Sequence, residues 1–178
     1  MRKNSFAGPL AFMAAVAVAG WLYFTPHLAL RRLQAAAESG DHAALREMVD
    51  FPAVRASLKE EVRGAIAHEM ERDGKRSPFS MFGAALAGMM VDPLVDSFVT
   101  PAGIAAATRG ERPRSDGEKE GVKKAEDDVE IARGYEGANR FVVHFRDRDD
   151  GGERIALVMA RDGVAGWKLT SIRLGARE

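Results

Sequence analysis

The sequence predicts an α+β fold with an N-terminal transmembrane helix, a helical layer and then a roughly four-stranded antiparallel sheet. Three observations support this prediction. A long stretch without charged side chains follows Arg2 and Lys3, helix-capping signals recur in the middle of the chain, and strand-like alternation fills its last part. We expect four segments: residues 1–25 as a membrane anchor or uncleaved signal, 26–110 as the helical part of a domain, 111–122 as a charged linker, and 123–178 as the sheet part of that domain.

The N-terminal stretch runs from Phe6 to Phe24 and contains 19 residues without a formal charge. As a helix these residues would span about 28 Å, close to the thickness of the hydrocarbon core of a bilayer. Trp21 and Tyr23 would then lie in the aromatic belt at the far interface. The alternatives are a cleaved signal peptide, with an A-x-A processing site at residues 17–19, and a buried helix of a cytosolic protein. A retained anchor is favoured because aromatic residues and a helix-like pattern follow directly.

The expected location follows from the charges that flank this stretch. A short tail that carries Arg2 and Lys3 is expected to stay in the cytoplasm, although Arg31 and Arg32 weaken the bias. We therefore expect a single-pass protein of the inner (cytoplasmic) membrane with a periplasmic or otherwise extracytoplasmic domain. Lys and Arg number 26 and Asp and Glu number 26, so the sequence predicts no basic surface for nucleic acid.

Helix starts are marked by a capping residue that stands one or two positions before a proline. Each occurrence of this pattern predicts the start of a helix, and the occurrences are Asp50–Pro52, Ser77–Pro78, Asp92–Pro93 and Thr100–Pro101. Two further helices are expected before them. One runs from Pro26 to Ser39, and the other begins directly after Asp41.

The stretch from Pro78 to Val91 contains 14 residues without a charge and is too short to span a bilayer. We predict that it forms a central buried helix. Two functional alternatives stay open. Small residues such as Gly83 and Ala87 would allow a dimer seam or a membrane-lying patch, whereas methionines would line an adaptable apolar pocket. The candidate residues for such a pocket or contact surface are Phe82, Leu86, Met89 and Met90.

Alternating apolar residues predict four strands, which begin near Val129, Phe141, Ile155 and Trp167. Glycine-containing turns separate them, so the strands are expected to be antiparallel neighbours. The alternation changes phase between Leu169 and Ile172, which predicts a β-bulge in the last strand. Trp167 is predicted to lie in the core, because an aromatic side chain there would bury a large apolar area.

Four motifs carry a resemblance to a known family: LALRRLQAAAESGD at 28–41, VDFPAVRASL at 49–58, VDPLVDSFVTPAGI at 91–104 and GWKLTSIRL at 166–174. Together with the N-terminal stretch, they resemble an uncharacterised bacterial family of membrane-anchored domains of unknown function. The resemblance implies a bacterial setting and a membrane anchor, and it brings no catalytic residues. More loosely, helices followed by a curved antiparallel sheet resemble the nuclear-transport-factor-two-like roll, which hosts enzymes, ligand carriers and scaffolds alike.

No motif in the sequence predicts a catalytic, cofactor-binding or metal-binding residue, and no cofactor is expected. The chain has no cysteine, which excludes a thiolate zinc site and a cysteine nucleophile. His68 and Glu69 begin an H-E-x-x-H pattern, but Arg72 stands at its last position. The acidic residues between Asp147 and Glu153 lack the spacing of a calcium loop, and a hairpin turn explains them better.

Three functions are compatible with these observations. The first is a non-enzymatic interaction module, anchored in a membrane, that binds a protein partner of unknown identity. The second is a carrier of a small apolar ligand between the helices and the sheet. The third is an enzyme whose site is assembled from scattered residues. The first is favoured because no catalytic pattern is present in the sequence.

Overall fold

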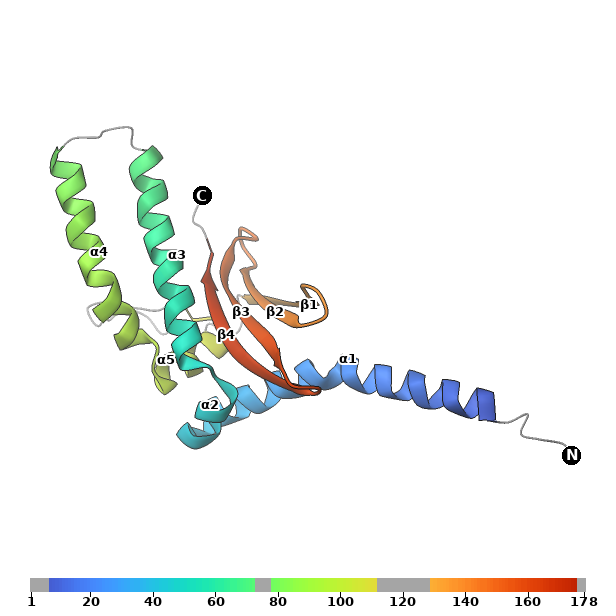
Figure 1. Cartoon of the computed structure of the whole chain (residues 1–178). Coiled ribbons are helices and arrows are strands. Elements are labelled where there is room, and N and C mark those ends of the chain that lie inside the picture. Colours follow the sequence, from blue (N-terminus) through green and yellow to red (C-terminus); the bar gives the residue numbers. More distant parts are fainter. Residues whose placement is uncertain (1–6, 73–77, 112–128, 176–178) are drawn as a thin grey trace, which may run out of the picture.

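The computed structural model of the chain describes residues 7–72, 78–111 and 129–175 (Figure 1). Helices precede an antiparallel sheet in this part, so the predicted α+β layout is confirmed. The helices are α1 (Ala7–Ser39), α2 (His42–Met48), α3 (Phe51–Arg72), α4 (Pro78–Phe98) and α5 (Pro101–Thr108). The strands are β1 (Val129–Tyr135), β2 (Arg140–Asp147), β3 (Glu153–Asp162) and β4 (Gly166–Leu174). The predicted linker comprises residues 111–122. Residue 111 is described, whereas residues 112–122 lie outside the described residues.

The anchor and the helix expected from Pro26 form one continuous helix, α1, so the prediction of a separate helix start there is wrong. Proline cannot donate to the carbonyl four residues earlier, which here belongs to Leu22. The Thr25 hydroxyl donates to this carbonyl oxygen at 2.8 Å, so the carbonyl keeps a partner and the helix continues past the proline. The N-terminal half of α1 is therefore a direct extension of the helix that packs on the sheet.

Side chains cap three helices at the predicted positions. Asp41 accepts hydrogen bonds from the first backbone N–H groups of α2. Asp50 Oδ1 accepts one from Ala53 N at 3.0 Å at the start of α3, and Thr100 Oγ1 accepts one from Gly103 N at 3.2 Å at the start of α5. These bonds satisfy backbone donors that the helices themselves leave free. Helix α4 begins at Pro78, as predicted.

The helix start predicted at Asp92–Pro93 is wrong, because Pro93 lies inside α4. Asp92 does not begin a helix. Its Oδ1 lies 2.7 Å from Arg63 Nη2 of α3, and Asp96, one turn later, lies 3.3 Å from Lys59 Nζ of the same helix. Contacts with α3 on both sides of the proline keep the two parts of α4 in line, and the local sequence around the proline does not reveal them.

The sheet has the order β1-β2-β3-β4, with every neighbouring pair antiparallel. The predicted β-bulge is confirmed. Val158 pairs with Ser171, but the next residue of β3, Met159, pairs with Leu169, so Thr170 is an extra residue in β4. This residue brings Leu169 and Ile172 to the same face of the sheet, where both are buried.

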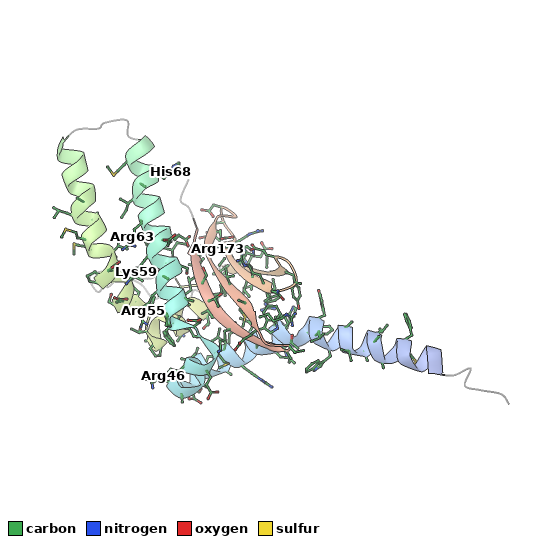
Figure 2. The ribbon with its side chains drawn as sticks, in the orientation of Figure 1. Arg46, Arg55, Lys59, Arg63, His68 and Arg173 are labelled. Atoms are coloured by element: carbon green, nitrogen blue, oxygen red, sulfur yellow. The ribbon has the colours of Figure 1, made fainter. Side chains whose placement is uncertain are left out.

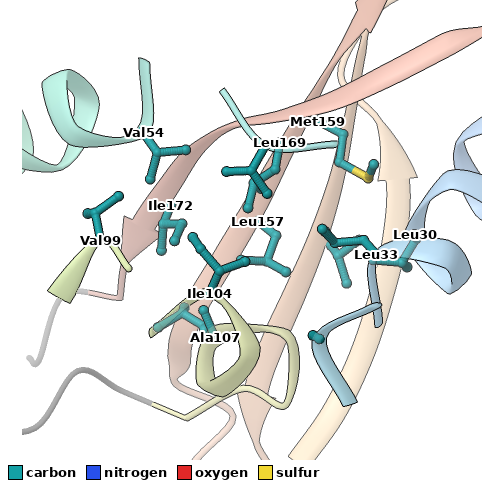
Figure 3. Close-up of a cluster of buried hydrophobic side chains, with 14 of the residues drawn as sticks. Leu30, Leu33, Val54, Val99, Ile104, Ala107, Leu157, Met159, Leu169 and Ile172 are labelled. Carbon is teal, nitrogen blue, oxygen red and sulfur yellow. The ribbon is translucent and has the colours of Figure 1, made fainter. Parts of the chain in front are cut away.

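The core lies between one face of this sheet and a layer of helices. Figure 3 shows side chains from three helices, including Leu33, Val54 and Ile104, that point toward Leu157 and Leu169 of the sheet. Trp167 is also part of this core and is 4% exposed, as predicted. The helices that cover the sheet are the C-terminal half of α1, the short α2, the first turns of α3, and α5.

The prediction of a central buried helix from Pro78 to Val91 is wrong. In this stretch Leu86 is 49% exposed, Met89 76% and Met90 70%. Helix α4 packs mainly against α3 rather than against the sheet. Among its described side chains, Val91 and Val95 of its C-terminal half enter the core, as does Val99 just after the helix. The physical reason is that other helices already cover the apolar face of the sheet.

Candidate functional site

Two exposed apolar surfaces are not explained by the core, and the first is the N-terminal half of α1. Among the described helices, the part of α1 from Phe12 to Ser39 is long and apolar enough to cross a membrane, and 17% of its apolar 18-residue window is buried. The large exposed side chains between residues 12 and 24 are Phe12, Met13, Val16, Val18, Trp21, Tyr23 and Phe24. By its length and composition, this helix could span a membrane.

The second surface is the outer side of α4, which we call the α4 face and define as Leu86, Met89, Met90 and Leu94. Three of these residues follow one another at intervals of four, so they form one stripe along the helix. Leu94 is 46% exposed, and the exposures of the other three are given above. Phe82, the remaining residue of the predicted contact surface, is in α4, but its side chain lies outside the described residues.

The opposite side of α4 is held by a row of charged contacts with α3. Figure 2 shows Arg55, Lys59 and Arg63 at successive turns along α3. The Arg63–Asp92 and Lys59–Asp96 pairs join the helices, and Arg55 Nη2 also donates to the Val99 carbonyl at 3.0 Å. The basic residues all come from α3 and the acidic residues from α4. This arrangement fixes which side of α4 faces α3 and leaves the α4 face directed away from it.

The charged contacts are individually weak. The side chains of Asp92 and Asp96 are about half exposed, at 51% and 52%. An exposed ion pair of this kind contributes about 0–1 kcal/mol to stability, since water competes for both partners. The row therefore sets the orientation of α4 more than it adds stability. The carboxylate of Asp50 is used in the cap of α3, and those of Asp92 and Asp96 in these pairs.

The second face of the sheet, away from the helices, carries a polar network. Both guanidinium Nη atoms of Arg173 bind the Glu136 carboxylate, at 3.0 and 3.1 Å. This hydrogen bonding lowers the pKa of Glu136 and raises the pKa of Arg173. His144 Nδ1 lies 2.6 Å from Glu153 Oε2 on the adjacent strands. Beside this network Val142, Ala156 and Val158 form a small second apolar cluster.

A shallow depression lies between α1, α5 and the edge strand β1. Its volume is about 200 Å³, and its lining combines apolar and polar side chains from Gln34, Glu38, Thr108, Arg109, Val129, Ile131 and Phe145. Ligand pockets typically have volumes of about 300–1,000 Å³ and a mostly apolar lining. The depression is therefore small for a carrier of an apolar ligand, and the predicted pocket residues of α4 do not line it.

The acidic segment after β2 forms a hairpin turn, as predicted. Gly151 adopts a φ of 70°, and Gly152 N donates to Asp150 Oδ1 at 2.7 Å. Asp147 is bound by the guanidinium of Arg154 at 2.8 Å. Within the described ranges, no group of three or more acidic or histidine side chains is placed to hold a metal ion.

Sequence reasoning missed the contacts between α1 and the sheet. Trp167 Nε1 donates to Thr25 Oγ1 at 2.8 Å, and the Tyr135 hydroxyl donates to the Tyr23 carbonyl at 2.7 Å. Burial raises the pKa of Tyr135, so this hydroxyl stays a donor over the physiological range. In the sequence, the only sign of these contacts is the group of aromatic residues near the end of the uncharged stretch. These residues predicted a membrane interface rather than contacts with the sheet.

Comparison with known proteins identifies the chain at the level of a family. No curated protein and no solved structure matches it. A family of proteins of unknown function matches residues 15–107, which is just over half of the 178 residues. The matched part contains most of α1, all of α2, α3 and α4, and all but the last residue of α5, so both exposed apolar surfaces lie mainly within it. The chain therefore belongs to the family described as protein of unknown function (DUF2939).

Proposed function

We propose that this protein is a single-pass, membrane-anchored domain that binds another protein through the α4 face. The observation that carries the proposal is the exposure of Leu86, Met89, Met90 and Leu94 on one side of a helix whose other side is held by α3. An apolar stripe that covers no core is typical of an interaction surface. The partner is expected to offer an apolar helix or groove, because residues 78–91 contain no charge that would require a complementary one.

The proposed location is the inner membrane of a bacterium, with α1 retained as a signal anchor and the domain on the periplasmic side. The exposed apolar half of α1 supports anchoring, and Arg2 and Lys3 before it support a cytoplasmic N-terminus. In Figure 1 the pair α3 and α4 runs crosswise to α1 and lies at the far end of the domain from the N-terminal half of α1. The α4 face would then be presented outside the membrane, at the end of the domain away from the anchor.

A protein partner explains the α4 face better than the other candidate functions do. An apolar ligand carrier requires a cavity with a mostly apolar lining, whereas the depression near β1 has a volume of about 200 Å³ and a mixed lining, and the α4 face is not part of it. An enzyme requires reactive groups at a shared site, whereas the α4 face contains only aliphatic and thioether side chains. The α4 face therefore favours binding over chemistry.

Site-specific photocrosslinking in native membranes would test the proposal. A photoreactive amino acid replaces Met89 in the full chain, and a matched control replaces Asp149 in the β2–β3 turn, which is also exposed but polar. We expect a discrete crosslinked product at position 89 that is absent at position 149. A second arm adds Leu86→Asp to the Met89 variant and should remove the product. The same crosslinking pattern at both positions, or a product that persists with Leu86→Asp, would contradict the proposal.

A further inference from the structure

The end of the sheet where α1 leaves the domain is formed by two turns that lie near this helix. The β1–β2 turn (residues 136–139) and the β3–β4 turn (residues 163–165) both lie at this end, and the β3–β4 turn reaches α1 (Figure 1). The β2–β3 turn lies at the opposite end. Any membrane crossed by the N-terminal half of α1 would therefore face the first two turns.

Two hydrogen bonds, one buried and one exposed, attach α1 to this end of the sheet. Trp167, just after the β3–β4 turn, donates to Thr25, and Tyr135, just before the β1–β2 turn, donates to the backbone carbonyl of Tyr23. Thr25 is 6% exposed and Trp167 4%. Because α1 is continuous through Pro26, no flexible linker separates the apolar half of α1 from these contacts. The position of the sheet relative to α1 is therefore determined by direct contacts.

Arg161 joins the two turns to each other. Its Nη1 donates to the Val164 carbonyl at 2.7 Å, and its Nε and Nη2 donate to the Ala138 carbonyl at 3.3 and 3.2 Å. The guanidinium carbon lies 4.5 Å from the centre of the Trp167 ring, which adds a cation–π contact. One side chain thus connects both turns to the tryptophan that binds α1.

The exposed residues of this end suit a lipid surface. Val164 is 79% exposed, more than any other large hydrophobic side chain among the described residues, and it stands at the tip of the β3–β4 turn. The nearby cations Arg140 and Lys168 have side-chain exposures of 56% and 43%. Their acidic neighbours are Glu136 and Asp162, and Lys168 binds Asp162 at 2.9 Å. An apolar tip flanked by cations is typical of surfaces that rest among phospholipid headgroups.

The position of Val164 relative to the aromatic residues of α1 also suits contact with a lipid surface. Trp167 contacts Thr25, and the turn that contains Val164 continues from Trp167 beside α1. Tyr23 and Phe24, which are 56% and 59% exposed, lie at this level of α1. Exposed aromatic residues at the end of an apolar helix mark the interface between lipid and water. The tip of the turn and the aromatic belt therefore lie close to one plane.

We infer that the β1–β2 and β3–β4 turns form a second membrane contact, in which Val164 inserts into the phospholipid interface beside α1. The inference rests on the proposed anchoring by α1 and adds to it. The domain is then held to the bilayer at two places, the helix and the turns. This contact fixes the tilt of the domain, and with it the direction in which the α4 face is presented.

Fluorescent labelling of single cysteines tests this contact, because the natural chain contains no cysteine. The full chain is reconstituted into vesicles of phosphatidylcholine and phosphatidylglycerol, with an environment-sensitive dye at one of three positions. Val164→Cys probes the turn, Val16→Cys probes the spanning half of α1, and Asp149→Cys probes the opposite end of the sheet. Lipids that carry a spin label near the headgroup, or deep in the acyl chain, quench any dye that lies at their depth.

We expect the dye at position 164 to emit at shorter wavelength than the dye at position 149, and to be quenched by the headgroup spin label. The dye at position 16 should be quenched by the deep label. Quenching at position 16 together with a water-exposed dye at position 164 would overturn the membrane contact of the turns while leaving the anchor intact. Absence of quenching at position 16 would overturn the anchoring itself and, with it, this inference.

Discussion

Trp167 and Thr25 are 142 residues apart in the sequence, yet the indole Nε1 donates a buried hydrogen bond to the threonine hydroxyl at 2.8 Å. The same hydroxyl donates to the Leu22 carbonyl, which has lost its usual donor because residue 26 is proline. One threonine therefore keeps α1 continuous and attaches it to the last strand. This relationship connects the helix proposed to enter the membrane with the core of the domain.

The first prediction concerns the stability contributed by Trp167. We expect Trp167→Ala to lower the free energy of unfolding of the full chain in detergent by about 3–5 kcal/mol, because it removes a large buried side chain and leaves a cavity. Trp167→Phe should have a smaller effect, since it keeps most of the apolar contact and loses the hydrogen bond to Thr25. Denaturant unfolding followed by circular dichroism measures both variants.

Trp21 supplies a matched control for this prediction. It is 57% exposed and lies in α1 outside the core, so Trp21→Ala should change the free energy of unfolding by no more than about 0.5 kcal/mol. A change below about 1 kcal/mol for Trp167→Ala would mean that the strand and α1 are not coupled as described.

The second prediction concerns Leu86, which stands at the centre of the α4 face. We expect Leu86→Asp to leave the domain folded, with a change in the free energy of unfolding within about 0.5 kcal/mol, because its side chain is half exposed. The same substitution should abolish binding to the partner captured by photocrosslinking, because it places a charge in an apolar contact. Thermal unfolding and crosslinking of one preparation separate the two effects.

Val95→Asp is the control on the same helix. Val95 is 2% exposed, so a charge there is buried without a partner and should prevent cooperative unfolding or lower the melting temperature sharply. If Leu86→Asp unfolded the domain to the same extent, the α4 face would be part of the core and its proposed role in binding would be refuted.

The third prediction concerns the pH dependence that Glu136 contributes. Hydrogen bonding by Arg173 lowers the pKa of Glu136 from its ordinary value of 4.5. A carboxylate with a lowered pKa in the folded state stabilises the fold above pH 4.5 and loses this contribution as the pH falls through the lowered pKa. We therefore expect Glu136→Gln to be less stable than the natural chain at neutral pH, with a difference that shrinks on acidification below pH 4.5. Urea unfolding at a series of pH values measures it, and a difference that grows on acidification would contradict it.

The fourth prediction has the opposite sign and concerns Glu61 in α3. Burial raises the pKa of Glu61 above 4.5, although its Oε1 accepts a hydrogen bond from Leu174 N at 2.7 Å. The natural chain should therefore lose stability as the pH rises through the raised pKa. Glu61→Gln keeps an acceptor for Leu174 N without the charge, so its stability relative to the natural chain should increase from acidic to neutral pH. The same unfolding series tests this, and equal pH dependence of the two proteins would show that burial does not affect this carboxyl group.

The fifth prediction concerns topology. A reporter that is active only in the periplasm, fused after Glu178 of the full chain, should be active, because the N-terminal cations are expected to keep the short tail in the cytoplasm. A reporter active only in the cytoplasm serves as the control at the same position. Activity of the cytoplasmic reporter, or recovery of the full chain in the soluble fraction, would contradict the proposed orientation or anchoring.

Local signals in the sequence determined most of the elements. Capping side chains at Asp50 and Thr100 mark helix starts because they satisfy backbone N–H groups only a few residues away. The phase change between Leu169 and Ile172 located the bulge, because alternation directly reports which face of a strand is buried. The uncharged N-terminal stretch indicated a helix of spanning length for the same reason, since length and apolarity are local properties.

Tertiary structure decided what each apolar stretch covers. The 14 uncharged residues of α4 predict a buried helix, but α1, α3 and α5 already cover the sheet. The charged contacts with α3 direct Leu86 and Met89 outward. The composition of a helix shows that it can be buried. It does not show which neighbouring element is free to cover it. Likewise, the continuation of α1 past Pro26 and of α4 past Pro93 depends on partners supplied by Thr25 and by α3. Local patterns predict most of the elements and their order, whereas the packing between distant segments selects which apolar surfaces stay exposed.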